Sequence, residues 1–167
     1  MKKSFLMLAA IVMMTACNGN GNTSSGSTSQ EEKKVEALAE NEYFKVMAVP
    51  DGWEVNKEFD SERGIEIKLK PGTDLGEWQN ATVSYYNIAD PQELVDQLMQ
   101  DENRKLGDDV TIGDKTFKQV LYINSADYYC ALITKHPKGS LEVMLTEKLT
   151  PDNAAVKAII EGIEYKN

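Results

Sequence analysis

Apolar and polar residues alternate along several short stretches of this chain, with the period of two that is typical of half-buried strands. The alternation is clearest between residues 65 and 69, where Ile65, Ile67 and Leu69 are separated by charged residues. The same pattern predicts strands over residues 43–49, 53–55, 81–87, 116–123, 128–135 and 141–147. Short connections at residues 124–125 and 137–139 favour an antiparallel meander for the last three strands.

Two other segments have helical signals. Asp90 is a suitable N-cap, Pro91 fits the first helical position, and Glu93 can complete a capping box. An apolar stripe of Leu94, Val95, Leu98 and Met99 follows, so we expect a helix that ends before Gly107. A second helix is expected from Thr150-Pro151 to about Glu161, with these residues facing inward: Ala155, Val156, Ile159, Ile160 and Ile163.

The order of these elements is three or four strands, a helix, three strands and a helix. Runs of strands separated by single helices are typical of an α+β fold. The sequence therefore predicts an α+β domain in which helices flank an antiparallel sheet.

The N-terminus carries a secretory signal. Lys2 and Lys3 precede an unbroken apolar run over residues 5–14, which is shorter than the roughly 20 residues that a bilayer-spanning helix needs. Small residues then lead to Cys17, in a pattern that resembles the lipobox of bacterial lipoproteins, with Met14 where that family usually has Leu. The alternative is an ordinary signal peptide in which Cys17 is incidental.

The lipoprotein resemblance implies that residues 1–16 are removed and that Cys17 receives a diacylglycerol thioether, with a further acyl chain such as palmitate on its amino group. Two or three chains anchor a protein stably in a membrane. Asn18 rather than Asp follows Cys17, and no acidic cluster comes next, so the expected location is the periplasmic face of the outer membrane. Residues 17–41 are assigned to the lipidated cysteine and a flexible tether, because residues 18–30 are polar or Gly throughout.

Residues 42–167 are predicted to form one domain. Residues 43–53 read Tyr-Phe-Lys-Val-Met-Ala-Val-Pro-Asp-Gly-Trp, which resembles the opening of PsbP-like domains, and residues 112–117 carry an Ile-x-Gly-x-x-Phe element in the matching place. The resemblance implies a PsbP-like α/β sandwich. It also implies a protein that binds or scaffolds, because members of that family share no catalytic residues.

Charge and composition exclude some functions. The chain has 27 acidic against 18 basic residues and a net charge of −9, which argues against nucleic-acid binding because such binding needs Lys and Arg to neutralise phosphates. His136 is the single histidine and is interpreted as a turn residue before Pro137. Cys130 is expected to be buried, on the same face of its strand as Tyr128 and Leu132. No catalytic residue, metal site or cofactor is predicted.

Aromatic residues are the candidates for a binding surface. Neighbouring residues of a strand point to opposite faces, so one Tyr of each pair 85–86 and 128–129 is expected to be in the core. Tyr86 and Tyr129, with Trp78 in a Gly-rich loop, are the speculative binding residues. The simpler interpretation is that these tyrosines only pack the sheet, since Tyr favours strands.

The sequence therefore predicts a non-enzymatic, membrane-anchored periplasmic lipoprotein that binds an envelope protein or helps to maintain the envelope. Its expected contact with the membrane is the N-terminal lipid. Two alternatives remain: an enzyme that acts on envelope glycans through acidic residues, and an immunity protein whose negative charge neutralises a basic toxin.

Overall fold

The computed structural model describes residues 36–59, 61–72, 79–146 and 148–167. Strands take up 44% of these residues and helices 13%. The elements in chain order are β1 (Ala39–Glu40), β2 (Phe44–Val46), β3 (Trp53–Val55), β4 (Gly64–Leu69), β5 (Asn80–Tyr86), α1 (Pro91–Leu98), β6 (Arg104–Leu106), β7 (Val110–Ile112), β8 (Lys115–Tyr122), β9 (Tyr128–His136), β10 (Gly139–Thr146), α2 (Ala154–Glu161) and β11 (Ile163–Tyr165).

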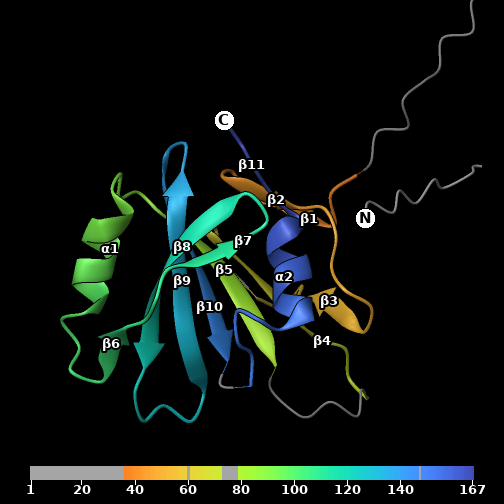
Figure 1. The fold of residues 1–167 in the computed structure, drawn as a ribbon. Coiled ribbons are helices and arrows are strands. Elements are labelled where there is room, and N and C mark those ends of the chain that lie inside the picture. The colour runs from red at the N-terminus through yellow and green to blue at the C-terminus, as the bar shows by residue number, and fades with distance from the viewer. Residues whose placement is uncertain (1–35, 60, 73–78, 147) are drawn as a thin grey trace, which may run out of the picture. The chain divides into compact units, whose positions relative to one another are not determined.

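The strands form two antiparallel sheets (Figure 1). In the larger sheet the order is β3-β4-β5-β10-β9-β8-β6, and β7 pairs with one end of β8. The smaller sheet has the order β1-β2-β11, which brings the last strand of the chain beside one of the first. The expected meander of β8, β9 and β10 is confirmed by the register, in which Lys118 faces Ile133 and Leu132 faces Val143.

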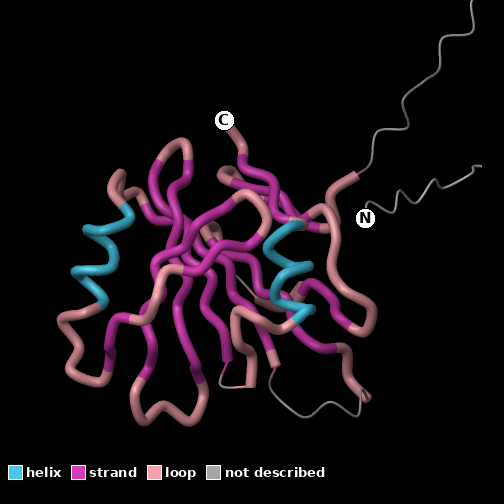
Figure 2. Tube along the Cα trace, viewed as in Figure 1, coloured by secondary structure: helices cyan, strands magenta, loops and turns pink. Residues whose placement is uncertain are grey.

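Different elements pack on the two faces of the larger sheet. Leu141, Val143 and Leu145 of β10 belong to the main core, together with residues of α2 and of the smaller sheet. On the opposite face α1 packs Leu94 and Val95 over β8, β9 and β10. Figure 2 shows the two helices as short segments at opposite sides of a body that consists mainly of strands.

The predicted fold class, an α+β sandwich of the PsbP-like kind with helices flanking the sheet, is wrong: the described part of the chain is β-rich and has two helices of 8 residues each. The first helix begins at Pro91 as expected, with the Asp90 side chain accepting a hydrogen bond from Gln92 N, but it ends at Leu98. Beyond this point Asp101 Oδ1 accepts from Asn103 N at 2.9 Å, a local turn that competes with helix.

Some residues that the sequence assigned to helices form paired strands instead. Arg104–Leu106 forms β6 at the edge of the larger sheet, opposite residues 120–122 of β8. At the other end of the chain α2 begins at Ala154, and Ile163 lies in β11 rather than in the helix. Gly162 permits this change of direction, because a Cβ there would lie 2.5 Å from the carbonyl oxygen of Ala48.

The structure bears on the expected boundary between the tether and the domain at residues 41 and 42. β1 lies inside the stretch 17–41 that the sequence assigns to the tether, and Ala39 pairs with Val46. Residues 1–16 and Cys17 lie outside the described residues. Neither helix in the described ranges has the length and apolar content needed to cross a bilayer.

Candidate functional site

A cleft forms where strands β8 and β9 stop pairing. Their last paired residues are Lys118 and Ile133. Beyond them β8 continues beside β7, where Val110 faces Phe117, while β9 stays with β10 as far as His136. Within the described ranges, residues 134–136 of β9 therefore have no strand partner on the β8 side.

The cleft has a volume of about 770 Å³, a size that suits a small ligand or a short peptide segment. It is lined by residues 114–116, 133–135 and 163–165, with Pro91 and Lys118. Neighbouring residues of a strand point to opposite faces of a sheet. Since both odd and even residues of each segment reach the cleft, strand edges rather than a single sheet face form its walls.

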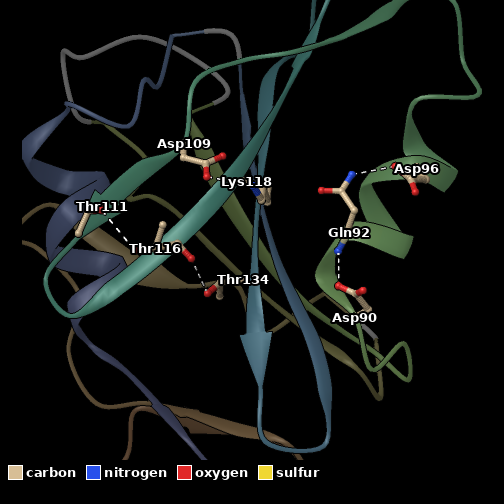
Figure 3. A network of polar contacts seen from close by, with 8 residues as sticks. All are labelled: Asp90, Gln92, Asp96, Asp109, Thr111, Thr116, Lys118 and Thr134. Atoms are coloured by element: carbon tan, nitrogen blue, oxygen red, sulfur yellow. Dashed lines mark hydrogen bonds and ion pairs between the residues drawn. The ribbon is translucent and has the colours of Figure 1, made fainter.

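Two walls of the cleft are tied by a side chain. Thr134 Oγ1 donates a hydrogen bond to the backbone carbonyl of Thr116 at 2.8 Å, and the hydroxyls of Thr111 and Thr116 lie 3.3 Å apart (Figure 3). The Thr134 bond joins β9 to β8 where their ladder has ended, whereas the Thr111–Thr116 contact joins β7 to β8.

Lysines surround the cleft. Lys118 Nζ lies 3.0 Å from Asp109 Oδ2, and Figure 3 shows this pair beside Thr116. Lys115 Nζ lies 3.2 Å from Asp114 Oδ1. Both carboxylate partners are at least half exposed, so water can replace either one at modest cost. Lys135 donates to the carbonyl oxygen of Ala89, just before α1.

The charge on Asp114 limits the chemistry of the cleft. The hydrogen bond and charge of Lys115 lower the pKa of Asp114, which keeps this carboxyl ionised at neutral pH. An ionised carboxylate cannot donate the proton that glycoside cleavage requires. The arrangement of Asp114 is therefore better suited to electrostatic recognition than to general-acid catalysis.

Tyr165 contributes a hydroxyl whose oxygen is shielded from solvent and lies near the Thr134 side chain. Burial raises the pKa of Tyr165 to about 12, so the group keeps its proton. Its ring lies 5.6 Å from Lys115 Nζ, in a cation–π arrangement, and 5.0 Å from the ring of His136. Because its oxygen is shielded from solvent, this hydroxyl is not exposed to a ligand in the cleft.

A second polar cluster lies under α1, on the other part of the larger sheet. Tyr86 donates a hydrogen bond to Glu142 Oε2 at 2.7 Å, and Glu142 is only 2% exposed. Its other oxygen, Oε1, has no partner in the part of the chain that the structure describes. Burial raises the pKa of Glu142, while the nearby Arg104, which lies 4.8 Å from the Tyr122 ring centre, opposes this.

Two of the predicted binding residues, Tyr86 and Tyr129, lie on opposite faces of the larger sheet. Tyr86 is half-buried beside the α1 cluster, and Tyr129 packs against the main core on the other face of the sheet. Trp78 lies outside the described residues, as does Cys17. Neither Tyr86 nor Tyr129 lines the cleft between β8 and β9. A binding role for these residues stays a prediction.

A β-bulge explains the position of Tyr129. Leu145 faces Cys130 while Thr146 faces Tyr128, so Tyr129 is an extra residue in β9. Cys130 is buried on the same side as Leu132, as expected, and burial raises its pKa to about 11. Tyr128 was expected on the same face as the buried Cys130, and because of the bulge this is wrong. Tyr128 is 42% exposed, and its ring lies 5.8 Å from that of Tyr122.

The interpretation of His136 as a turn residue is also wrong. His136 ends β9 and is fully buried. Its Nδ1 accepts from Lys138 N at 3.1 Å, so the hydrogen bond of 2.9 Å between Nε2 and the Tyr43 carbonyl oxygen requires Nε2 to donate. Burial lowers the pKa of this neutral imidazole.

The most informative side chains for function were not found from the sequence. Lys118 and Thr134 follow the ordinary alternation of their strands, and Tyr165 was expected to lie beyond the last helix. Glu142 carried no clear signal either, because it alternates with Leu141 and Val143 as a solvent-facing residue of a strand would. Among residues 36–59, 61–72, 79–146 and 148–167, no three His, Cys, Asp or Glu side chains gather closely enough to hold a metal ion.

The chain matches no family model and no curated protein. Among solved structures it is similar to a protein from Bacteroides thetaiotaomicron VPI-5482, whose crystal structure is at 1.50 Å resolution, with 15% sequence identity and a TM-score of 0.46. The similarity covers 80% of this chain and 47% of the other, so this chain spans about half the length of that protein.

Proposed function

We propose that this chain is a lipid-anchored, non-enzymatic protein of the bacterial cell envelope that binds a partner protein in the cleft between β8, β9 and β11. The cleft is the observation that carries the proposal. It combines a volume of about 770 Å³ with walls made from strand edges and three lysines. Such convergent polar groups around a concave surface are typical of binding sites.

The sequence supports the anchor and the location. Residues 1–16 have the pattern of a secretory signal, and Cys17 stands where lipoproteins carry their lipid. The polar composition of residues 18–30 suits a tether between the lipid and the folded part. A protein held in this way on the periplasmic face of the outer membrane would meet envelope proteins at close range.

Site-specific crosslinking in the native host tests the proposal. A photo-reactive residue such as benzoylphenylalanine replaces Thr116 in the cleft, and a control replaces Lys105, which is exposed on β6 at the far end of β8. We expect the Thr116 position to capture one envelope protein that the Lys105 position does not capture. Equal capture at both positions, or none at either, would contradict binding in the cleft.

The non-enzymatic assignment has its own test. The purified full chain is incubated with cell-wall glycans, and the release of soluble sugars is measured. We expect no turnover. Turnover that disappears in Asp114→Asn or Glu164→Gln, the two carboxylates of the cleft, would establish the enzyme that the sequence left as an alternative.

A further inference from the structure

The backbone of β11 has a free edge. In the smaller sheet β11 is an outer strand, and β2 is its one neighbouring strand within the described residues. Met47 N donates to Gly162 O at 2.8 Å, and Lys166 N donates to Tyr43 O at 2.7 Å. The register therefore turns the backbone groups of residues 162, 164 and 166 towards β2.

Alternation then fixes the direction of the remaining backbone groups. In an antiparallel strand, N–H and C=O groups of neighbouring residues point to opposite edges. The groups of Ile163 and Tyr165 consequently point away from β2, towards an edge where no strand of the described chain pairs. Both residues line the cleft. This edge offers two N–H donors and two C=O acceptors to whatever occupies the cleft.

The charges around the cleft indicate the kind of segment that it would accept. Lys115, Lys118 and Lys135 outnumber the two lining carboxylates, although the whole chain has a net charge of −9. Charges beyond about 8 Å are screened at physiological salt. With Asp109 paired to Lys118, the cleft is locally close to neutral, in contrast to the acidic balance of the whole chain. The exposed partners of Lys115 and Lys118 can give way to a carboxylate of a ligand.

We infer that an extended, acidic segment of the partner protein adds to β11 as a fourth strand of the smaller sheet. This inference rests on the proposed function and states how the partner is held. Backbone hydrogen bonds to Ile163 and Tyr165 supply the pairing, as in other cases where a peptide extends a sheet. Acidic side chains of the segment face the lysines.

A designed peptide tests the inference on the full chain. The probe has seven residues with alternating Val and Glu, and its dissociation constant is measured by fluorescence polarisation. One comparison peptide carries N-methyl groups at alternate backbone nitrogens, and another has Lys in place of Glu. Removing two backbone hydrogen bonds should weaken binding by roughly tenfold or more, and the Lys peptide should bind at least as poorly.

Two matched variants test whether the positive charge of a cleft lysine contributes to binding of the acidic peptide. Lys118→Glu should weaken binding of the Val–Glu peptide by roughly tenfold, because it places a negative charge where the acidic side chains arrive. Lys105→Glu makes the same change on β6 and should leave the dissociation constant within about twofold. Equal affinity of the N-methylated and unmodified peptides, or equal effects of the two variants, would overturn the inference.

The position of the peptide gives an independent measurement. On a ¹⁵N-labelled full chain we expect the largest amide shifts at Ile163 and Tyr165. Shifts centred on Trp53–Val55, the outer strand β3 of the larger sheet, would place the peptide elsewhere and overturn the inference. Failure of every peptide, together with successful crosslinking from position 116, would reject strand addition and leave partner binding in place. Failure of the peptides and of the crosslinking would reject both strand addition and partner binding in the cleft.

Discussion

Thr134 Oγ1 donates a hydrogen bond of 2.8 Å to the backbone carbonyl of Thr116, at the point where β8 departs from β9. One side-chain contact thus holds together two strands that no longer share a ladder. The width of the cleft at this point depends on that contact.

Thr134→Val tests the importance of this bond for stability. Val has nearly the same shape but leaves the carbonyl of Thr116 without its partner, so we expect the free energy of unfolding to fall by about 1–2 kcal/mol in urea denaturation. Thr111→Val is the control, because the hydroxyls of Thr111 and Thr116 meet at 3.3 Å in an exposed place. The control should change stability by less than about 0.5 kcal/mol. Equal losses in the two variants would show that the Thr134 bond has no special role.

Glu142→Gln should change how stability depends on pH. Because burial raises the pKa of Glu142 in the folded chain, the unfolded chain releases this proton first as pH rises. Glu142 therefore contributes stability below the ordinary value of 4.5, and this contribution is lost as pH rises through the raised pKa. The charged or titratable groups near it are Tyr86, Tyr122 and Arg104.

The expected result is that wild type and Glu142→Gln have similar stability at low pH and that the variant is the more stable at pH above the raised pKa. Urea midpoints measured across the acidic and neutral range check this. Glu93→Gln in α1 controls for the loss of one negative charge at an exposed position. If the urea midpoint of Glu142→Gln changed with pH in the same way as that of wild type, the raised pKa of Glu142 would be contradicted.

His136 should take up its proton at a lower pH in the folded chain than in the unfolded chain. Its pKa is lowered by burial, so its imidazole takes up a proton only below the ordinary value of 6.5, and stability that is present above 6.5 is lost as pH falls through the lowered pKa. The ring signals are unambiguous in NMR because the chain has one histidine. A midpoint near 6.5 is expected only in the urea-unfolded chain. A folded midpoint at or above 6.5 would refute the buried neutral state.

Cys17→Ala should detach the protein from membranes. Without the thiol there is no site for the diacylglycerol, so the protein should appear in the soluble fraction after detergent-free lysis or keep its signal segment. Cys130→Ala is the matched control, since Cys130 is a buried free thiol in β9, and it should stay in the membrane fraction. Unchanged fractionation and mass in Cys17→Ala would refute lipidation.

Local sequence patterns predicted the long strands and the short strands β2 and β3, but missed four other short strands. β4, β5 and the meander of β8, β9 and β10 are long enough to show a period of two, and each appears near its expected position. β1, β6, β7 and β11 have two or three residues each, too few for any periodicity. They also lack a Pro-x-Gly turn such as Pro50-Asp51-Gly52, which separates β2 from β3. Their formation depends on pairing with distant strands, and for this reason the fold class was wrong.

The candidate site was harder to predict than the fold. Lys118, Thr134 and Tyr165 meet because β8 changes partner and because β11 returns to β2, and neither event leaves a local sequence signal. Glu142 shows a related effect. Its alternating strand implies a solvent-facing side chain, yet α1 covers that face, and the residue becomes a buried partner of Tyr86.

Amide hydrogen exchange at three neighbouring residues tests the central claim most directly. In the free full chain, Ile163 and Tyr165 should exchange quickly, while Glu164, which is turned towards β2, exchanges slowly. Saturation with the Val–Glu peptide should slow the exchange of Ile163 and Tyr165 by at least about tenfold and leave Glu164 unchanged. Unaltered exchange at Ile163 and Tyr165 in the saturated complex would contradict strand addition at β11.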